Sequence, residues 1–227
     1  MGSLTLSKID RLYWMGRYTE RVNTTVRFLM DYYDKLIDGN PMPHEEFCKR
    51  LSLPDVYTSD ACFLYHYVYD RDNADSLRIA ADRMLGNGMT LRETIGSNTL
   101  SYLQLAVNNL DSSEDSDCPM IYAQQMLDDL MAFRGSFDDN IEEESIRDII
   151  KCGLQTERVS LYLRLGYPDG ICQKEIGKLL ARVRKTPVRT NSAAFSQLLL
   201  TQANGDGSAL PDNRSKLIEA AETLIEI

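Results

Sequence analysis

The hydrophobic positions near the start of the chain recur with the 3.6-residue period of an α-helix. Apolar residues keep this spacing from Ile9 to Tyr33, and no cluster of Gly and Pro interrupts it before residues 39–43. Ser7 and Asp10 resemble a capping box, in which a hydroxyl and a carboxylate three residues later satisfy the first amides of a helix. We therefore predict one long helix from about Ser7 to the break at residues 39–43.

Helical periodicity continues over most of the remaining chain, and no convincing alternating strand pattern is found. Residues 41–59 are rich in Pro and polar side chains and predict a loop with one short helical turn over 45–51. Asn73 is expected to cap a helix that begins near Ala74, and the glycines of 86–88 to end or kink it. Further helices are expected over residues 91–110, 120–133, 143–165, 173–185 and 193–203, and from 212 onward. The acidic residues 111–117 and the residues 204–211 are expected as loops, and residues 135–140 as a turn. The pattern predicts an all-α fold.

A motif repeat overlies the helical period. The motif Gly-x-x-Thr-Glu-Arg-Val begins at Gly16 and returns at Gly153, and at the same offset of 137 residues Ile9 matches Ile146. Solenoid repeats recur every 20 to 50 residues or so, which is far shorter than this offset. We therefore predict an antiparallel helical bundle in which two long helices, related by a pseudo-two-fold axis, face each other.

The repeat supplies candidate functional residues. Because residues four apart share a helix face, each repeat Gly lies one turn from the repeat Glu, and a Gly allows a neighbouring backbone to approach closely. In one interpretation Glu20 and Glu157 are buried anchors, each bonded to an Arg of the facing helix, that set the register of the bundle. In the other, Arg17, Arg21 and Arg158 converge with both carboxylates on a cleft that binds an anion or handles a proton.

Composition excludes several classes of function. A net charge of -9 argues against nonspecific nucleic-acid binding. The basic segment Lys178–Arg189 is expected to be a solvated helix face, or otherwise to dock an acidic partner or a phosphate. Five scattered cysteines without a Cys-x-x-Cys pair favour a reducing, cytoplasmic setting. No stretch approaches the roughly 20 apolar residues of a membrane span, and the first residues lack the features of a signal peptide.

Cofactor chemistry finds no support in the motifs. A di-metal carboxylate bundle needs Glu-x-x-His pairs, and neither His44 nor His66 follows a Glu by three residues, so no metal is expected. His44 is expected in the Pro-rich loop, and His66 is expected to be a partly buried neighbour of two tyrosines. No phosphate-binding Gly-rich loop or nucleophile elbow is found, so no cofactor is expected. Cys152 has no His nearby in the sequence and is expected to be a small buried hydrophobe.

These residues resemble the bacterial alpha-E family of helical domains. The resemblance rests most on the opening segment Leu12–Arg21, and it extends over nearly all of residues 7–166. One departure is Leu154, which stands at the position that matches Arg17, where family members often carry Arg. The other matching segments, in chain order, are Asp70–Asn73, Arg92-Glu93, Gly135–Asp139 and the second repeat. From this resemblance the secondary site candidates are Trp14, Asn73, Arg92 and Glu93.

The resemblance also implies a biological setting. Alpha-E proteins are encoded beside, or fused to, circularly permuted ATP-grasp proteins and transglutaminase-like proteins, which implies ATP-dependent amide-bond formation and peptide modification. Since this chain has no nucleotide motif, the ligase chemistry would belong to the partner. The leading hypothesis is a noncatalytic or co-catalytic helical partner of the ligase, with residues 1–170 as the bundle and 171–227 as a helical extension packed on it. The alternative is an enzyme or small-anion-binding protein that uses the Glu/Arg cleft, and homo-oligomerisation through the long helices stays open.

Overall fold

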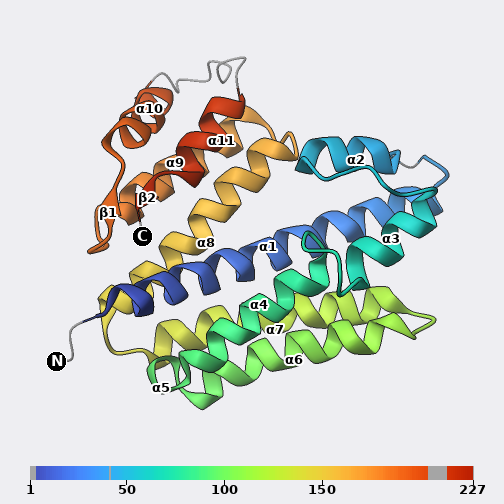
Figure 1. The fold of residues 1–227 in the computed structure, drawn as a ribbon, viewed down its shortest axis with the longest axis horizontal. Coiled ribbons are helices and arrows are strands. Elements are labelled where there is room, and N and C mark those ends of the chain that lie inside the picture. The colour runs from blue at the N-terminus through green and yellow to red at the C-terminus, as the bar shows by residue number, and fades with distance from the viewer. Residues whose placement is uncertain (1–3, 41, 204–213, 227) are drawn as a thin grey trace. The chain divides into compact units, whose positions relative to one another are not determined.

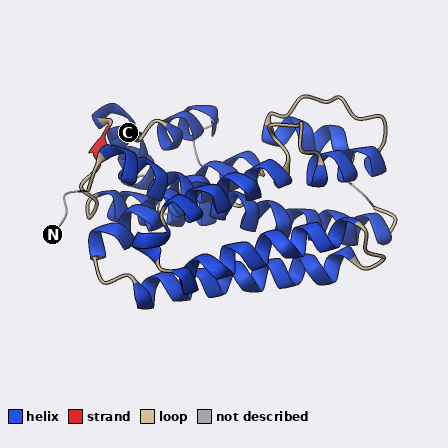
Figure 2. Ribbon diagram, turned by 60° about the horizontal axis from the view of Figure 1, so that its bottom comes forward, coloured by secondary structure: helices blue, strands red, loops and turns tan. Residues whose placement is uncertain are grey.

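The computed structural model describes residues 4–40, 42–203 and 214–226. Helices account for 78% of this part of the chain and are joined by loops, which confirms the predicted all-α class (Figure 2). The exception is an antiparallel pair of two-residue strands, β1 (Arg189–Thr190) and β2 (Ile225–Glu226). Two residues are too few to show the alternating pattern by which a strand is predicted. Among the described helices, none has the length and apolar character needed to cross a membrane.

The chain forms two compact units. Unit 1 contains the described residues of Met1–Glu20 and Glu143–Ile227, and unit 2 contains Arg21–Glu142. The first helix, α1 (Leu6–Ile37), contributes residues 6–20 to unit 1 and 21–37 to unit 2. The two units divide after Glu20 and after Glu142. The boundary that the sequence suggested at Gly170, between a bundle and a C-terminal extension, stays a prediction.

Unit 1 is organised around α8. Figure 1 shows α8 beside the first half of α1, with α9 and α11 packed on α8, and α10 packed on α9 and α11. Buried aliphatic side chains from several helices, among them Val159, Leu179, Leu198 and Leu217, form its core. The helices after α1 are α8 (Glu144–Arg164), α9 (Asp169–Val183), α10 (Ser192–Ala203) and α11 (Arg214–Glu222).

Unit 2 is built on a helical hairpin of α6 and α7, against which α4 packs (Figure 1). A cluster of aromatic rings joins the second half of α1 to α2 and α3. Phe47 and Phe63 are fully buried at its centre, and the centres of their rings lie 4.8 Å apart. The helices after α1 are α2 (His44–Leu51), α3 (Asp60–Tyr69), α4 (Leu77–Thr90), α5 (Arg92–Ile95), α6 (Ser97–Glu114) and α7 (Pro119–Asn140).

Two predicted helix starts are wrong by a few residues. At α1 the Thr5 hydroxyl accepts from the Lys8 amide at 3.3 Å, so the cap lies before the expected Ser7. At α4 the Ser76 hydroxyl accepts from the Ile79 amide, and Asn73 instead closes a turn by accepting from the amide two residues later. In both cases an alternative hydroxyl nearby serves the same capping chemistry.

Glycine proved an unreliable marker of helix ends in unit 2. Gly86, Gly88 and Gly135 lie inside α4 and α7, where the predicted break and turn do not occur. The break falls at Gly96, whose φ of 81° suits glycine and which separates α5 from α6 inside the expected 91–110 helix. Packing along a neighbouring helix outweighs the cost of about 1 kcal/mol for a Gly in a helix interior.

Three other expectations are corrected. The helix α6 runs to Glu114, so the first four residues of the predicted acidic loop are helical. His44 is buried and begins α2 instead of lying in a loop. His66 is exposed, although Tyr65 is a neighbour as expected. The predictions for residues 45–51, 143–165 and 193–203 agree with α2, α8 and α10, whereas the loop predicted over 204–211 lies outside the described residues.

Candidate functional site

The two repeat glycines lie where α1 and α8 touch backbone to backbone. A Cβ on Gly16 would lie 2.2 Å from the carbonyl oxygen of Ile150, and one on Gly153 would lie 2.1 Å from that of Tyr13. Both distances are too short for real atoms, so a residue with any side chain requires the helices to separate. The close approach expected from the repeat is therefore observed, and it is reciprocal (Figure 1).

Glu157, one turn beyond Gly153, binds an arginine of the facing helix. The Arg17 Nε donates to Glu157 Oε2 at 2.7 Å, and both side chains are buried. Burial by itself would lower the pKa of the Arg17 guanidinium, but the Glu157 carboxylate outweighs it and raises that pKa. The guanidinium carbon also lies 4.7 Å from the ring centre of Trp14, which is partly exposed.

Glu20 forms the second pair in the opposite direction. Arg158 donates from Nε and Nη2 to the two oxygens of Glu20, each at 2.8 Å, which is the bidentate geometry that favours Arg over Lys. The Glu20 side chain is fully buried, while 23% of the Arg158 side chain is exposed. The expected bond between each repeat carboxylate and an arginine of the facing helix is thus observed; a functional role for the site stays a prediction.

A third carboxylate, Glu175 of α9, extends this network and was missed by the sequence analysis. It accepts from Gln155 at 2.7 Å and from Lys178 at 2.6 Å, and it lies 3.7 Å from Arg158. Burial raises the pKa of the Glu175 carboxyl, but the hydrogen bonds from Gln155 and Lys178 and the Lys178 charge lower it by more, so that this pKa lies below its usual value. No signal in the repeat pointed to Glu175, because it belongs to a helix outside the repeat.

Two further residues at the contact between α1 and α8 carry buried hydroxyl groups. The Tyr13 and Thr156 hydroxyls are buried, and neither has a hydrogen-bond partner of ordinary geometry among the described residues. Burial raises the pKa of Tyr13 to about 12 and that of the neighbouring Cys152 thiol to about 12. Both groups are therefore neutral at physiological pH, and Cys152 is the buried hydrophobe that was expected.

Of the other candidates, Arg21 follows Glu20 directly and is the first residue of unit 2. Asn73 also belongs to unit 2, where its amide donates to the Tyr57 hydroxyl at 3.1 Å. Arg92 is exposed and donates to Ser97, and Glu93 is exposed. Asn73 therefore serves a turn and Arg92 a helix end in unit 2, whereas Trp14 packs against Arg17 in unit 1.

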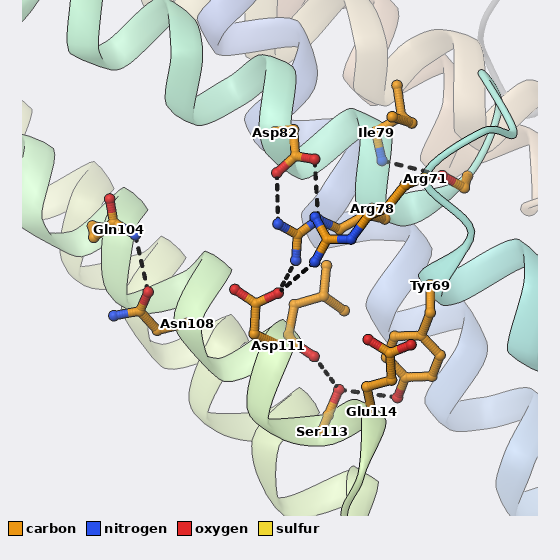
Figure 3. Close-up of polar contacts among 12 residues, drawn as sticks. Tyr69, Arg71, Arg78, Ile79, Asp82, Gln104, Asn108, Asp111, Ser113 and Glu114 are labelled. Carbon is orange, nitrogen blue, oxygen red and sulfur yellow. Dashed lines mark hydrogen bonds and ion pairs between the residues drawn. The ribbon is translucent and has the colours of Figure 1, made fainter.

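Unit 2 holds a polar cluster of its own that the sequence analysis did not identify. Figure 3 shows the buried Arg78 of α4 between Asp82, one turn along the same helix, and Asp111 of α6. Arg71 reaches the same Asp111 oxygen at 3.3 Å. The segment Asp70–Asn73, singled out in the sequence, thus contributes a cation that helps to tie the α3–α4 connection to α6.

The arrangement around the repeat is suited to holding helices together. Three cations, Arg17, Arg158 and Lys178, form ion pairs with three carboxylates, Glu20, Glu157 and Glu175. In the basic segment noted in the sequence, the Arg182 guanidinium donates to the Asp148 carboxylate of α8 at 2.8 Å. No group of three or more His, Cys, Asp or Glu side chains among the described residues is arranged to hold a metal ion.

Comparison with known proteins gives one match. The family model Alpha-E, described as a predicted alpha-helical domain with a conserved ER motif, matches residues 6–167. That range contains both Glu-Arg pairs of the repeat and ends just after α8. No curated protein and no solved structure matches the chain.

Proposed function

Because the chain belongs to the Alpha-E family, we propose that it acts as a noncatalytic or co-catalytic helical partner of an ATP-grasp-type ligase that forms amide or peptide bonds. The ligase, or the ligase with its substrate, would be the partner, and a transglutaminase-like protein a second one. The reducing cytoplasm is the proposed setting, in keeping with five cysteines that carry no pairing motif.

The observation that carries this proposal is the closure of the Glu/Arg network. Glu20 and Glu157 are 0% and 2% exposed, and each already has an arginine partner from the facing helix. A general base or an anion site needs groups that a substrate can reach. Paired and buried carboxylates instead set the register of a helix pair, which suits a rigid protein that presents its surface to a partner.

The alternative, an enzyme or small-anion-binding protein with a central Glu/Arg cleft, has less support. Its donors would be Arg17 and Arg158, and both guanidinium groups are engaged with carboxylates. An incoming anion would have to displace Glu20 or Glu157 and leave a buried negative charge without its partner, which typically costs ~3–5 kcal/mol.

The test is co-expression with a circularly permuted ATP-grasp protein from the same genome. We expect the two proteins to elute together on size exclusion, and the ligase to consume ATP faster in the complex than alone. Absence of a complex at micromolar concentrations, together with an unchanged ligase rate, would contradict the proposal.

The variant Glu20→Gln distinguishes a structural role of the Glu/Arg network from a catalytic or anion-binding role. It should lower the free energy of unfolding by about 3 kcal/mol, because it removes the bidentate charge partner of Arg158 and leaves only Glu175, at 3.7 Å. The complex should nevertheless form and stimulate the ligase at a temperature where the variant is folded. Glu219→Gln, an exposed carboxylate in the same unit, is the matched control and should change stability by less than ~0.5 kcal/mol. Loss of ligase stimulation by folded Glu20→Gln would favour the alternative.

A further inference from the structure

Unit 2 contains a cavity that is separate from the repeat and from every residue of the candidate site. Its volume is about 320 Å³, and it is bounded by the second half of α1, by α3, and by the adjoining ends of α6 and α7. That volume lies at the lower end of the range for small-molecule sites. Its walls are mostly apolar and include Met30, Leu64, Val68, Met120, Ala123 and Met126.

Three methionines in the wall make the cavity adaptable, because the thioether side chain is unbranched and polarisable. Tyrosine rings from three helices, Tyr33, Tyr65, Tyr69 and Tyr122, add π faces to the lining. Such faces attract the edges of aromatic ligands and also cations. The wall therefore suits an apolar or aromatic body of modest size.

The polar groups of the lining gather where α6 ends. Tyr69 and Ser113 share a hydrogen bond of 3.0 Å between their hydroxyls, so they are mutually satisfied (Figure 3). Glu114, the last residue of α6, is exposed and accepts from the Tyr65 hydroxyl at 3.1 Å. Among the described residues no cation lies within ion-pair distance of the Glu114 carboxylate, in contrast to Asp111, which holds Arg71 and Arg78.

We propose that this cavity binds a small amphipathic amine, with its apolar or aromatic body among the methionines and its ammonium group against Glu114. The carboxylate supplies the negative charge that an ammonium needs, and the adjacent Tyr65 and Tyr69 rings add cation–π attraction. Asp115 and Asp117 on the following turn and loop strengthen the negative potential at this end of the helix. A neutral ligand of the same shape would lack this charge attraction, and an anionic one would be repelled by the Glu114 carboxylate.

The probe is 4-phenylbutylamine, titrated into the full chain labelled with ¹³C at its methionine methyl groups. We expect saturable shifts of the Met30, Met120 and Met126 signals, and none for the Met15 and Met84 signals, since those two methyl groups are buried elsewhere. The dissociation constant should be at least tenfold lower than that of 4-phenylbutan-1-ol, and 4-phenylbutyrate should bind more weakly still.

Two pairs of variants locate the ligand. Ala123→Phe fills the cavity and should abolish the shifts, while Gln125→Phe adds the same ring to an exposed position of α7 outside the lining and should not. Glu114→Gln should bind the amine no better than the alcohol, while Asp139→Asn, which removes an exposed carboxylate near the C-terminal end of α7 and outside the lining, should keep the preference. If Ala123→Phe does not fold, Ala61→Phe at an exposed lining position of α3 replaces it.

Three results would each overturn the proposal. They are the absence of shifts up to millimolar probe, equal affinity of the wild-type chain for amine and alcohol, and undiminished binding in the folded cavity-filling variant. None of these results bears on the ligase association, which is measured with a protein partner.

Discussion

At the scale of single residues, the repeat is a device for bringing two backbones into contact. Gly16 and Gly153 each lie against the carbonyl of a residue on the opposite helix, and the glutamate one turn later meets an arginine from that helix. The glycine removes the side chain that would hold the helices apart, and the ion pairs select one register among those that close contact allows. Glycine and glutamate therefore act together, which explains why they recur at one spacing.

Gly153→Ala should destabilise the protein by ~1–3 kcal/mol or more. The new methyl group would lie 2.1 Å from the Tyr13 carbonyl oxygen, a backbone atom that cannot rotate away, and overpacking of a rigid contact costs ~1–3 kcal/mol or more. Urea denaturation monitored by circular dichroism measures the change.

Gly135→Ala is the matched control for that prediction. Gly135 is exposed within α7 and a Cβ there would meet nothing within 4 Å, so alanine should stabilise the protein by ~0.5–1 kcal/mol through its higher helix propensity. Equal effects of the two substitutions would show that the contact at Gly153 is not as close as described.

At the scale of elements, α2 is held to the rest of unit 2 by a buried histidine at its first residue. The His44 Nδ1 donates to Asp60 Oδ1 at 2.9 Å, and the Tyr32 hydroxyl donates to the same oxygen at 2.9 Å. Burial opposes the charged form of His44, but hydrogen bonds to Asp60 and to the Tyr57 carbonyl outweigh burial and raise its pKa above 6.5. Burial likewise raises the pKa of Asp60, and the bonds from His44 and Tyr32 more than offset it, so that the pKa falls below 3.8.

These shifts give the stability of the protein a defined pH dependence. Because the pKa of His44 is raised in the folded state, its contribution is complete below pH 6.5 and is lost as the pH rises through the raised value. Asp60 has the opposite sign, so its contribution is present above pH 3.8 and is lost as the pH falls through the lowered value. We expect the free energy of unfolding to fall from pH 6 to pH 9 more steeply in the wild type than in His44→Gln, as measured by urea denaturation at each pH. Parallel curves for the two proteins would contradict a charged His44–Asp60 pair.

At the scale of the whole molecule, each unit combines an apolar core with a few buried ion pairs. Unit 2 is a continuous segment, Arg21–Glu142, whereas unit 1 joins the first residues of the chain to those from Glu143 onward, and α1 belongs to both units. Residues far apart in sequence must therefore meet before unit 1 is complete. The net charge of the protein is -9. Arg17 and Arg158 form ion pairs with carboxylates of the same unit.

The five cysteines report on whether the whole molecule is folded. Cys118 is exposed and Cys62 partly so, while Cys48, Cys152 and Cys172 are buried. Burial raises the pKa of all three buried thiols, which withholds the reactive thiolate. Ellman's reagent should modify one or two thiols of the native protein within minutes and all five in guanidinium chloride. Rapid modification of all five without denaturant would show that the units open readily.

Several features followed from local sequence alone. The 3.6-residue period identified most of the helices, because amphipathic spacing is a property of each segment, and α8 ends at Arg164, one residue before the predicted end. The glycine contact could also be predicted, since a Gly and a Glu on one helix strip in two copies admit few other uses. By contrast, Gly86 and Gly135 carry the same local signal for a break as Gly96, and only the packing of each helix against its neighbours decided which of them interrupts a helix.

The sequence by itself determined the helical class, the family and the residue types at the helix contact, because periodicity, glycine and the Glu-Arg pairs are written in short segments. Only the tertiary structure decided the partners. Arg17, which has no counterpart in the second copy because Leu154 stands there, binds Glu157, and Glu175 joins from a helix outside the repeat. Which charges meet, and where the apolar walls of unit 2 leave space, depends on how helices distant in sequence cross, and no local pattern encodes that geometry.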